Sequence, residues 1–338
     1  SVFPDTKSPK YKIFSLTTPP QLDTAEYPYY PTDNDYLICS EEYGIPQKRH
    51  RVILLGIRED LSITPDTLKK ANKPINLSEI IGDLPKIRSA INRSFDFSVT
   101  NINGDKERFY TSIKDSEATW VELTNKFKRE IISWNGFAKD FSPGAKPVPE
   151  NGTGSEFVPY NTPSTEIPLY KWYHDPQVKG AVNHESRAHL VQDLKRYMFS
   201  SMFAKTYQRF PRLAEYEQHS KDLLPDHENA RSGKFADRFR VQVPDQPATT
   251  VTSHISKDGH YFIHYDPEQC RSLTVREAAR IQTFPDNYLF CGSRTAQFHQ
   301  VGNAVPPFLA NQIASVVKDI FIGEYLIRDR ELEEHLQL

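Results

Sequence analysis

Three side chains that can bind anions or nucleobases alternate along one short stretch of the sequence. Gln47, Arg49 and Arg51 take every second position as the chain enters an apolar run at residues 52–55. Alternate side chains of a β-strand lie on the same face, so an amide and two guanidinium groups would project into one cleft. A guanidinium donates hydrogen bonds in a fixed planar fork, which suits phosphate oxygens and base acceptors. The pattern is equally typical of a strand edge that is protected by surface charge.

A helix with a well-defined start is predicted near the other end of the chain. Residues 273–286 read LTVREAARIQTFPD, in which Thr274 and Glu277 stand three positions apart. This is the spacing of a capping box, in which each side chain accepts a hydrogen bond from the backbone N–H of the other residue. Phe284 followed by Pro285 predicts the end of the helix.

A second helix is predicted after a tether at residues 287–300. Residues 300–307 read QVGNAVPP, and the proline at position 306 favours the first turn of a helix. The residues that follow place apolar side chains on one stripe, which must be buried against another part of the protein. The stripe consists of Leu309, Ile313, Val316, Val317 and Ile320.

Together these stretches resemble the DNA cytosine-5 methyltransferases. YGIPQKRHRV, which begins at residue 43, resembles the family's Gln-x-Arg-x-Arg motif, LTVREAARIQTFP its penultimate motif and QVGNAVPP its last motif. INLSEIIGDLP at residues 75–85 resembles the segment that often precedes the family's target recognition domain. The motifs stand in the family's order, and the long dissimilar segment between them lies where the family keeps that domain.

The resemblance implies an α/β fold. It would comprise the C-terminal portion of a Rossmann-like S-adenosylmethionine methyltransferase domain plus a mixed α+β target recognition domain. Residues 1–95 would be the C-terminal part of the catalytic domain, and residues 96–290 the target recognition domain. Residues 291–338 would be a tether and a helix that returns to the catalytic domain, where its apolar stripe would pack beside the strand after Arg51.

The resemblance also implies roles for the first motif. Enzymes of this family flip a cytosine out of the duplex, add a cysteine thiolate to C6 of its ring, and methylate C5 from S-adenosylmethionine. Arg51 would stabilise the negative charge that develops at the O2 edge of the cytosine. Arg49 would contact the DNA backbone, and Gln47 would support the loop.

Roles follow for the last two motifs as well. Asn303, Ala304 and Val305 would close over the methionine end of the cofactor, although Asn303 is also a residue type favoured at helix caps. Arg276 would organise the target recognition domain through hydrogen bonds.

The nucleophile that the family requires is absent from the sequence. In the family the reactive cysteine follows a proline, whereas Cys39, Cys270 and Cys291 follow Ile38, Gln269 and Phe290. The sequence also lacks the Phe-x-Gly-x-Gly turn of the cofactor site and the Glu-Asn-Val that holds the target base. We therefore expect the C-terminal half of a methyltransferase, inactive alone, whose partners are double-stranded DNA and an N-terminal half or separate catalytic subunit. A stand-alone DNA-binding specificity subunit and an inactive remnant are the alternatives.

Local patterns predict the elements of the middle segment. Helical spacing predicts a helix over residues 189–207, whereas residues 117–134 show mixed helical spacing. Two strands, residues 249–255 and 260–265, are predicted to pair through a hairpin turn at Asp258-Gly259.

Two other parts of the middle segment are polar. Residues 142–165, rich in Pro, Gly and Asn, are expected to form an exposed loop. Residues 183–196 form a basic stretch that contains Arg187 and Arg196, and it is as typical of an exposed face as of a phosphate contact.

The composition bears on the cellular compartment and on the kinds of ligand that the protein could bind. The 338 residues carry a net charge of −2 and a mean hydropathy of −0.61, which neither indicates nor excludes a nucleic-acid binder, because a local basic face suffices. Without a membrane-spanning run or a signal-peptide pattern, and with three cysteines that suggest no disulfide framework, the sequence predicts a cytoplasmic protein with no membrane partner. No metal site is expected, because the candidate ligands show no paired spacing: His254, His260, His264 and Cys270.

Overall fold

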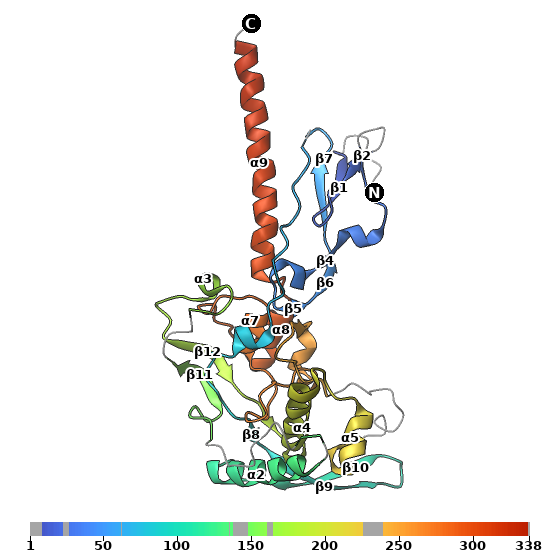
Figure 1. Ribbon diagram of the computed structural model, residues 1–338, viewed down its shortest axis with the longest axis vertical. Coiled ribbons are helices and arrows are strands. Elements are labelled where there is room, and N and C mark those ends of the chain that lie inside the picture. The colour runs from blue at the N-terminus through green and yellow to red at the C-terminus, as the bar shows by residue number, and fades with distance from the viewer. Residues whose placement is uncertain are drawn as a thin grey trace.

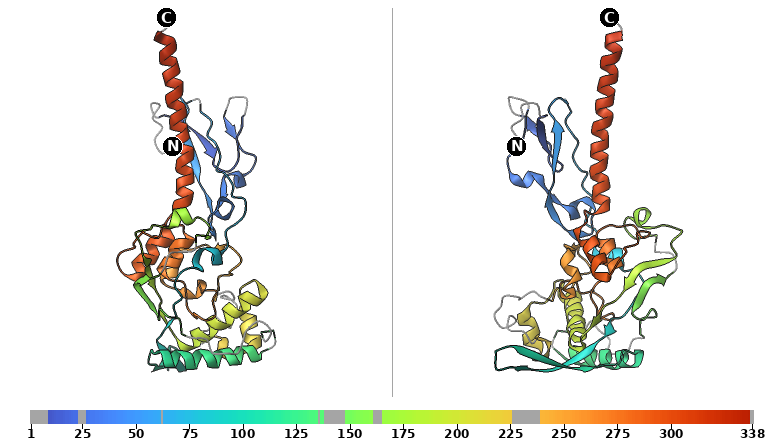
Figure 2. Two further views of the ribbon diagram at one scale, coloured as in Figure 1. Left: turned by 60° about the vertical axis from the view of Figure 1, so that its left-hand side comes forward. Right: turned by 180° about the vertical axis from the view of Figure 1, so that it is seen from behind.

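The computed structural model describes residues 9–22, 27–61, 63–134, 136–137, 148–160, 165–225 and 239–336, with side chains as far as residue 323. Most of these residues form one body, from which an N-terminal part and the long helix α9 (Pro307–Leu336) project on the same side (Figure 1). Two further views show the N-terminal part beside α9 as well (Figure 2).

The elements are mostly short. The strands are β1 (Tyr11–Ser15), β2 (Gln21–Leu22), β3 (Pro28–Tyr29), β4 (Leu37–Cys39), β5 (Gln47–Lys48), β6 (His50–Val52), β7 (Leu54–Arg58), β8 (Ala90–Ile91), β9 (Arg93–Thr100), β10 (Lys106–Ser112), β11 (Gly154–Pro159), β12 (Gly180–Glu185), β13 (Ala188–His189) and β14 (Ala248–Thr249). The α-helices are α1 (Leu77–Ile81), α2 (Glu117–Ser133), α3 (Tyr170–Tyr173), α4 (Val191–Tyr207), α5 (Leu213–His219), α7 (Val275–Ile281), α8 (Arg294–Asn303) and α9. The 3-10 helices are η1 (Asp33–Tyr36), η2 (Ser40–Tyr43), η3 (Lys221–Leu223), η4 (Ser253–Ser256) and η5 (Gly259–Tyr261).

Within the described residues the strands pair two by two rather than in one continuous sheet. The N-terminal part holds the antiparallel pair β1–β7 and the antiparallel pair β4–β6, in which Ile38 faces Arg51. The body holds the antiparallel pairs β9–β10 and β11–β12. Two short parallel pairs, β5–β14 and β8–β13, join segments that are far apart in the sequence. The result is a mixed α/β fold.

Helix α7 lies in the core of the body, and all its residues are buried. The predicted capping box is confirmed, since Thr274 Oγ1 accepts from the Glu277 N–H at 3.2 Å and the Glu277 carboxylate accepts from the Thr274 N–H at 2.8 Å. The helix ends at Ile281, before the predicted Phe284-Pro285, because Thr283 adopts a left-handed backbone with φ 63°. Apolar side chains of α1 and α8 pack with those of α7 in one core, which includes Leu77, Ile80, Ala278, Ile281, Phe298 and Val301.

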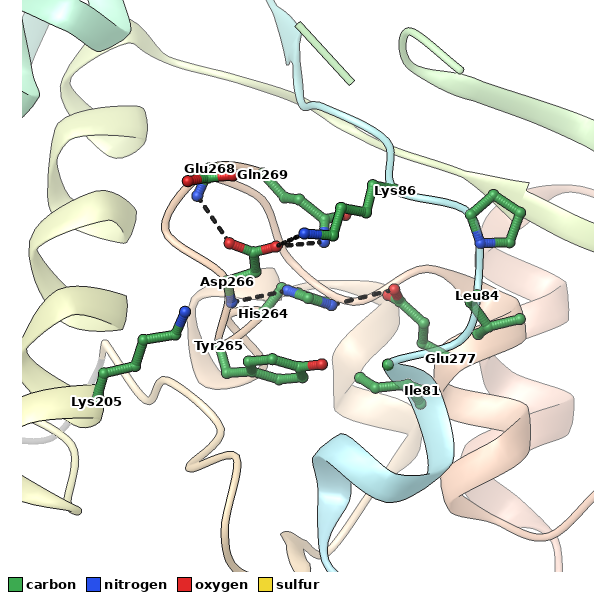
Figure 3. Close-up of a pocket in the computed structure, with 12 residues that line it drawn as sticks. Ile81, Leu84, Lys86, Lys205, His264, Tyr265, Asp266, Glu268, Gln269 and Glu277 are labelled. Carbon is green, nitrogen blue, oxygen red and sulfur yellow. Dashed lines mark hydrogen bonds and ion pairs between the residues drawn. The ribbon is translucent and has the colours of Figure 1, made fainter. Parts of the chain in front are cut away.

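Glu277 belongs to a buried ionic cluster. Its two carboxylate oxygens each accept a 2.6 Å hydrogen bond from the Arg271 guanidinium, and His264 Nε2 lies 3.4 Å from Oε1. Figure 3 shows His264 between Asp266 and Glu277, at the wall of a cavity of about 230 Å³. Burial alone would raise the pKa of Glu277, but the Arg271 charge and the hydrogen bonds hold this pKa well below its ordinary value of 4.5.

Replacing Glu277 with glutamine is expected to destabilise the fold by about 3–5 kcal/mol at neutral pH, because Arg271 would keep a buried charge without its counter-ion. A carboxyl group whose pKa falls on folding stabilises the folded state above its unfolded pKa. The stability difference between the two proteins should therefore shrink as the pH falls below 4.5, which thermal unfolding at a series of pH values measures.

Glu42→Gln is the matched control for this change. It removes an exposed ion pair, that of Glu42 with Lys70, and should alter the stability by less than about 1 kcal/mol. Equal losses of stability in the two variants at neutral pH would contradict the role given to the buried cluster.

The second core of the body surrounds α4. Helix α4 confirms the helix predicted over residues 189–207, and α2 forms over most of residues 117–134, where the helical spacing is mixed. They contribute to one core that is rich in aromatic side chains, namely Trp120, Phe127, Tyr197, Phe199 and Phe203.

The apolar stripe of α9 packs beside the strands after Arg51, as the family resemblance implies. Leu309 and Val316 share a buried cluster with Leu16 and Ile38 of the N-terminal part, and the partly buried Ile53 and Leu55 lie against it. A second small cluster joins Ile320 to Phe14 and Ile57 of the paired strands β1 and β7. The start of α9 is thereby held beside the strands that follow Arg51.

The hairpin predicted over residues 249–265 is wrong. Strand β14 ends at Thr249, and the residues beyond it form η4 and η5. Ala248 faces Gln47 of β5 in a parallel pair, and the Ile263 N–H donates to the Arg240 carbonyl. Thr249 likewise faces Lys48, so residues of both predicted strands pair with other segments rather than with each other.

Two other local predictions are corrected. The predicted tether at residues 287–300 contains the start of α8, which Ser293 caps by accepting from the Ala296 N–H at 3.3 Å. The predicted loop at residues 142–165 contains β11, which pairs with β12. Residues 142–147 and 161–164 of that loop lie outside the described residues.

Neither a membrane helix nor a cluster of metal ligands occurs in the part of the chain that the structure describes. None of its helices is long and apolar enough to cross a membrane. No group of three or more His, Cys, Asp or Glu side chains within it could hold a metal ion.

Candidate functional site

Gln47 is the point at which distant segments meet. Its side chain is fully buried, and its Nε2 donates to Gln282 Oε1 at 2.7 Å and to the Ile281 carbonyl at 3.2 Å. Its Oε1 accepts from the Val251 N–H at 3.1 Å. The amide therefore joins β5 to the end of α7 and to the segment after β14.

Arg49 lies at the boundary of the interior. Its Nη1 donates to the Val251 carbonyl at 3.0 Å, so the same residue that binds Gln47 also holds the first arginine. Burial, and then the nearby charge of Arg51, lower the pKa of Arg49 from its ordinary value. A cation held in this way keeps further N–H donors for a ligand.

Arg51 is the outermost of the three residues. It lies on β6, is exposed, and its Nη1 donates to the His50 carbonyl at 2.6 Å. The side chains of the motif thus run from the buried Gln47 through Arg49 to Arg51 at the surface. A guanidinium with only a local backbone contact among the described residues is available to an incoming acceptor.

A hollow of about 590 Å³ lies beside this strand. Lys48 and Arg240 line it together with three threonines and an aromatic wall, and Thr250 donates to the Lys48 carbonyl at 2.5 Å. Cations, hydroxyl groups and aromatic rings are the groups that contact phosphates and stack on bases. Groups of all three kinds therefore line the hollow, and Lys48 of the motif is among them.

The turn at Asn303, Ala304 and Val305 lies between α8 and α9. Asn303 is the last residue of α8 and so does not cap α9, which corrects the alternative prediction for this residue. A Cβ on Gly302 would lie 2.2 Å from the Ser253 backbone nitrogen, so only glycine permits this approach of α8 to η4. Asn303 and Val305 are exposed and offer an amide and an apolar side chain to a ligand.

Arg276 is buried and makes its contacts within the protein. Its guanidinium donates to the carbonyls of Val182, Pro285 and Tyr288 at 3.0, 3.1 and 2.5 Å. Burial lowers the pKa of Arg276 to about 10. These bonds tie α7 to β12 and to the loop before α8.

Arg187 and Arg196 are both engaged within the body. Arg196 is 7% exposed, pairs with Asp193 at 2.7 Å and donates to the carbonyls of Leu223 and Leu224. Arg187 donates to the Ile255 carbonyl at 2.5 Å and lies over the Phe298 ring. Arg196 therefore does not belong to an exposed basic face, because the carbonyls of Leu223 and Leu224 at the end of η3 cover its guanidinium.

Two residues of this site carry no sequence signal strong enough to single them out. Gln282 and Thr283 are fully buried at the end of α7, and Gln282 is the partner of Gln47. The only hint in the sequence is that Gln282, a polar residue, follows an apolar helical pattern, and a buried polar side chain needs a hydrogen-bond partner.

The site thus combines a segment that carries Arg49 and Arg51, a hollow lined by Lys48 and Arg240, and an exposed turn on a mixed α/β fold. The sequence model of the C-5 cytosine-specific DNA methylases matches residues 21–319. The chain belongs to the C-5 cytosine-specific DNA methylase family.

Curated relatives are type II methyltransferases. M.Bpa9945I of Bacillus paralicheniformis is 31% identical over 300 residues, which cover 87% of this chain and 52% of that protein. M.DdeI of Desulfomicrobium norvegicum is 28% identical over 300 residues, which cover 85% of this chain and 54% of that protein. A solved structure of a putative DNA modification methyltransferase encoded within an E. coli prophage covers 92% of this chain and 61% of its own, at 17% identity and a TM-score of 0.42. The chain spans about half the length of the curated relatives it matches.

Proposed function

We propose that this chain supplies target recognition and part of the active site of a DNA (cytosine-5) methyltransferase. A further polypeptide segment would supply the cysteine nucleophile, the Phe-x-Gly-x-Gly turn and the Glu-Asn-Val of the family. The proposed division assigns residues 1–95 to a Rossmann-like catalytic domain, 96–290 to target recognition and 291–338 to the return into the catalytic domain. The partners are double-stranded DNA and the completing segment, in the cytoplasm.

The contact of Gln47 with Gln282 carries this proposal. It brings the Gln-x-Arg-x-Arg strand against the penultimate motif, although 235 residues separate the two glutamines. Gln282 in turn donates to the Val301 carbonyl at 2.9 Å, two residues before the turn of the last motif. The stretches that resemble the family therefore converge on one place, as a shared site requires.

Arg51 is proposed to act on the target base. As a nucleophile adds to the ring of a flipped cytosine, negative charge develops at the O2 edge, and an exposed guanidinium can donate to that oxygen. Arg49 and Lys48 are proposed to hold the DNA backbone, with Lys48 at the hollow. These assignments divide the motif between chemistry and binding.

Asn303, Ala304 and Val305 are proposed to hold one edge of the cofactor. S-adenosylmethionine, when bound, supplies the methyl group. The exposed amide of Asn303 and the apolar side chain of Val305 suit a ligand with polar and apolar parts, so the residues present fit such a group. The remaining contacts would come from the completing segment.

Exposed apolar residues in the N-terminal part support the need for this segment. Ile13, Val52 and Leu54 are 40%, 59% and 56% exposed on strands that pair only two by two among the described residues. Phe321 is 65% exposed on α9, the helix that projects from the body (Figure 1). Such a surface favours burial against further strands and helices.

The pure chain is expected to transfer no methyl groups to DNA, because none of its three cysteines follows a proline. Duplex DNA and labelled S-adenosylmethionine are incubated with the chain alone, and then with a polypeptide that carries the family's missing motifs. Transfer should require both, and we call their combination the completed enzyme. Transfer by the chain alone contradicts the proposal, whereas DNA binding without transfer by the completed enzyme would favour a specificity subunit.

A further inference from the structure

We propose that Gln282 and Thr283, at the end of α7, are positioning residues for the turn at Asn303–Val305. They would hold this turn in a fixed place relative to both the arginine strand and the recognition segment. The inference rests on the proposed function for the ligand of the turn. Its geometry rests on the hydrogen bonds of two adjacent, fully buried residues.

Both the oxygen and the nitrogen of the Gln282 side-chain amide form hydrogen bonds. Its Oε1 accepts from Gln47 Nε2 at 2.7 Å, and its Nε2 donates to the carbonyls of Val301 at 2.9 Å and Val251 at 3.4 Å. Rotation of the amide by half a turn would set oxygen against the Val301 carbonyl and nitrogen against Gln47 Nε2. The hydrogen bonds therefore allow one orientation, which links the strand of Arg49 to the end of α8.

Thr283 holds the other side of the turn. Its hydroxyl accepts from the Phe308 N–H at 3.1 Å, in the first turn of α9, where a backbone N–H has no partner within the helix. Its carbonyl accepts from the Trp172 indole N–H at 2.8 Å, and the rings of Trp172 and Phe308 meet edge to face with centroids 5.1 Å apart. Thr283 thus joins Trp172, which lies in the proposed target recognition domain (residues 96–290), to the start of α9.

The backbone of Thr283 shows that this arrangement is imposed by its surroundings. Its φ of 63° lies in the left-handed region, which β-branched residues rarely adopt. Strained backbone persists where neighbouring contacts over-determine it, and such positions gather at functional sites. Here the contacts are the bonds to Phe308 and Trp172.

The two residues bracket the turn. Gln282 binds Val301, two residues before Asn303, and Thr283 binds Phe308, three residues after Val305. Because Gln282 also binds Gln47 and Thr283 also binds Trp172, the turn has a fixed place relative to both neighbours. Loss of the hydrogen bonds of either residue should loosen the turn without removing a side chain that is proposed to contact DNA.

The first test uses this chain by itself. Thr283→Val keeps the side-chain shape but removes the acceptor, so the Phe308 amide should exchange its hydrogen about tenfold faster or more. Hydrogen exchange is followed by mass spectrometry on peptides that contain Phe308. Thr283→Ser keeps the hydroxyl and should restore slow exchange. Thr124→Val, which alters a threonine bonded only within α2, is the matched control and should leave Phe308 unchanged.

The second test uses the completed enzyme and measures two affinities separately. Thr283→Val, which loses one hydrogen bond, should raise the Kd for S-adenosylmethionine about tenfold and change the Kd for DNA less than about twofold. Gln282→Leu, which loses three, should raise the Kd for S-adenosylmethionine at least as much. Thr283→Ser should restore cofactor affinity. Gln242→Leu removes another buried glutamine, one that binds Thr249 and the Tyr261 carbonyl, and should spare cofactor affinity.

The outcomes separate this inference from the proposed function. Unchanged exchange at Phe308, or cofactor affinity unchanged in both variants, overturns the positioning role. If the unaltered completed enzyme does not bind S-adenosylmethionine, the proposed function and the cofactor part of this inference both fail. The exchange experiment would then still decide whether Thr283 holds the start of α9.

Discussion

Replacing Arg51 with alanine is expected to lower the turnover of the completed enzyme by about 100-fold or more, the usual cost of losing one donor to a developing negative charge. The affinity for DNA should change much less, because Arg51 is exposed and donates to the neighbouring His50 carbonyl. Single-turnover methyl transfer and equilibrium binding to the same duplex measure the two quantities.

Arg49→Ala is the matched variant, since it removes the same group two residues away. It should weaken DNA binding and lower the slope of log affinity against log salt by about one, as expected for one lost phosphate contact. Thermal unfolding of both variants shows whether the loss of the Arg49 bond to the Val251 carbonyl disturbs the fold. Normal turnover in Arg51→Ala would place the charge-stabilising donor elsewhere.

Exchange of residues 96–290 for the corresponding segment of a related methyltransferase is expected to change which sites are methylated. Sequence is read by side chains delivered into the grooves of DNA, and this segment carries the irregular, loop-rich part of the chain. The flanking motifs resemble features that all members would share, so they offer nothing that distinguishes one target from another. Sequencing of methylated cytosines before and after the exchange measures the outcome.

The two ends of the exchanged segment must fit the core that the rest of the chain forms. Leu77 and Ile80 of α1 pack with α7, and the Arg276 guanidinium binds the Val182 carbonyl, so both boundaries touch the shared core. A graft that keeps residues 273–284 of this chain is the control for misfolding. Retention of the original sites by a folded, active hybrid would place recognition in the completing segment.

Local signals in the sequence predicted local structure well. The spacing of Thr274 and Glu277 predicted a capping box, and the stripe from Leu309 to Ile320 predicted a buried helix face, because both depend on neighbours within one helix. The paired strands 249–255 and 260–265 were predicted from the same kind of signal and do not form. Their backbone groups bond to β5 and Arg240, which are not local to them.

Contacts between distant residues could not be predicted. Nothing near Gln47 indicates that its partner is Gln282, since that bond depends on how α7 packs against β5. Arg196 was placed in a basic stretch by composition, but the carbonyls of Leu223 and Leu224 that bury it come from a later turn. Burial of a charged residue is decided by such tertiary partners rather than by its neighbours in sequence.

The most direct test of the central claim is to identify the methylated nucleoside. Duplex DNA is treated with the completed enzyme, digested to nucleosides and analysed by mass spectrometry. The proposed function predicts 5-methylcytosine, formed only when this chain and the completing polypeptide are both present, and greatly reduced with Arg51→Ala. A different methylated base, or equal 5-methylcytosine from the completing polypeptide without this chain, would contradict it.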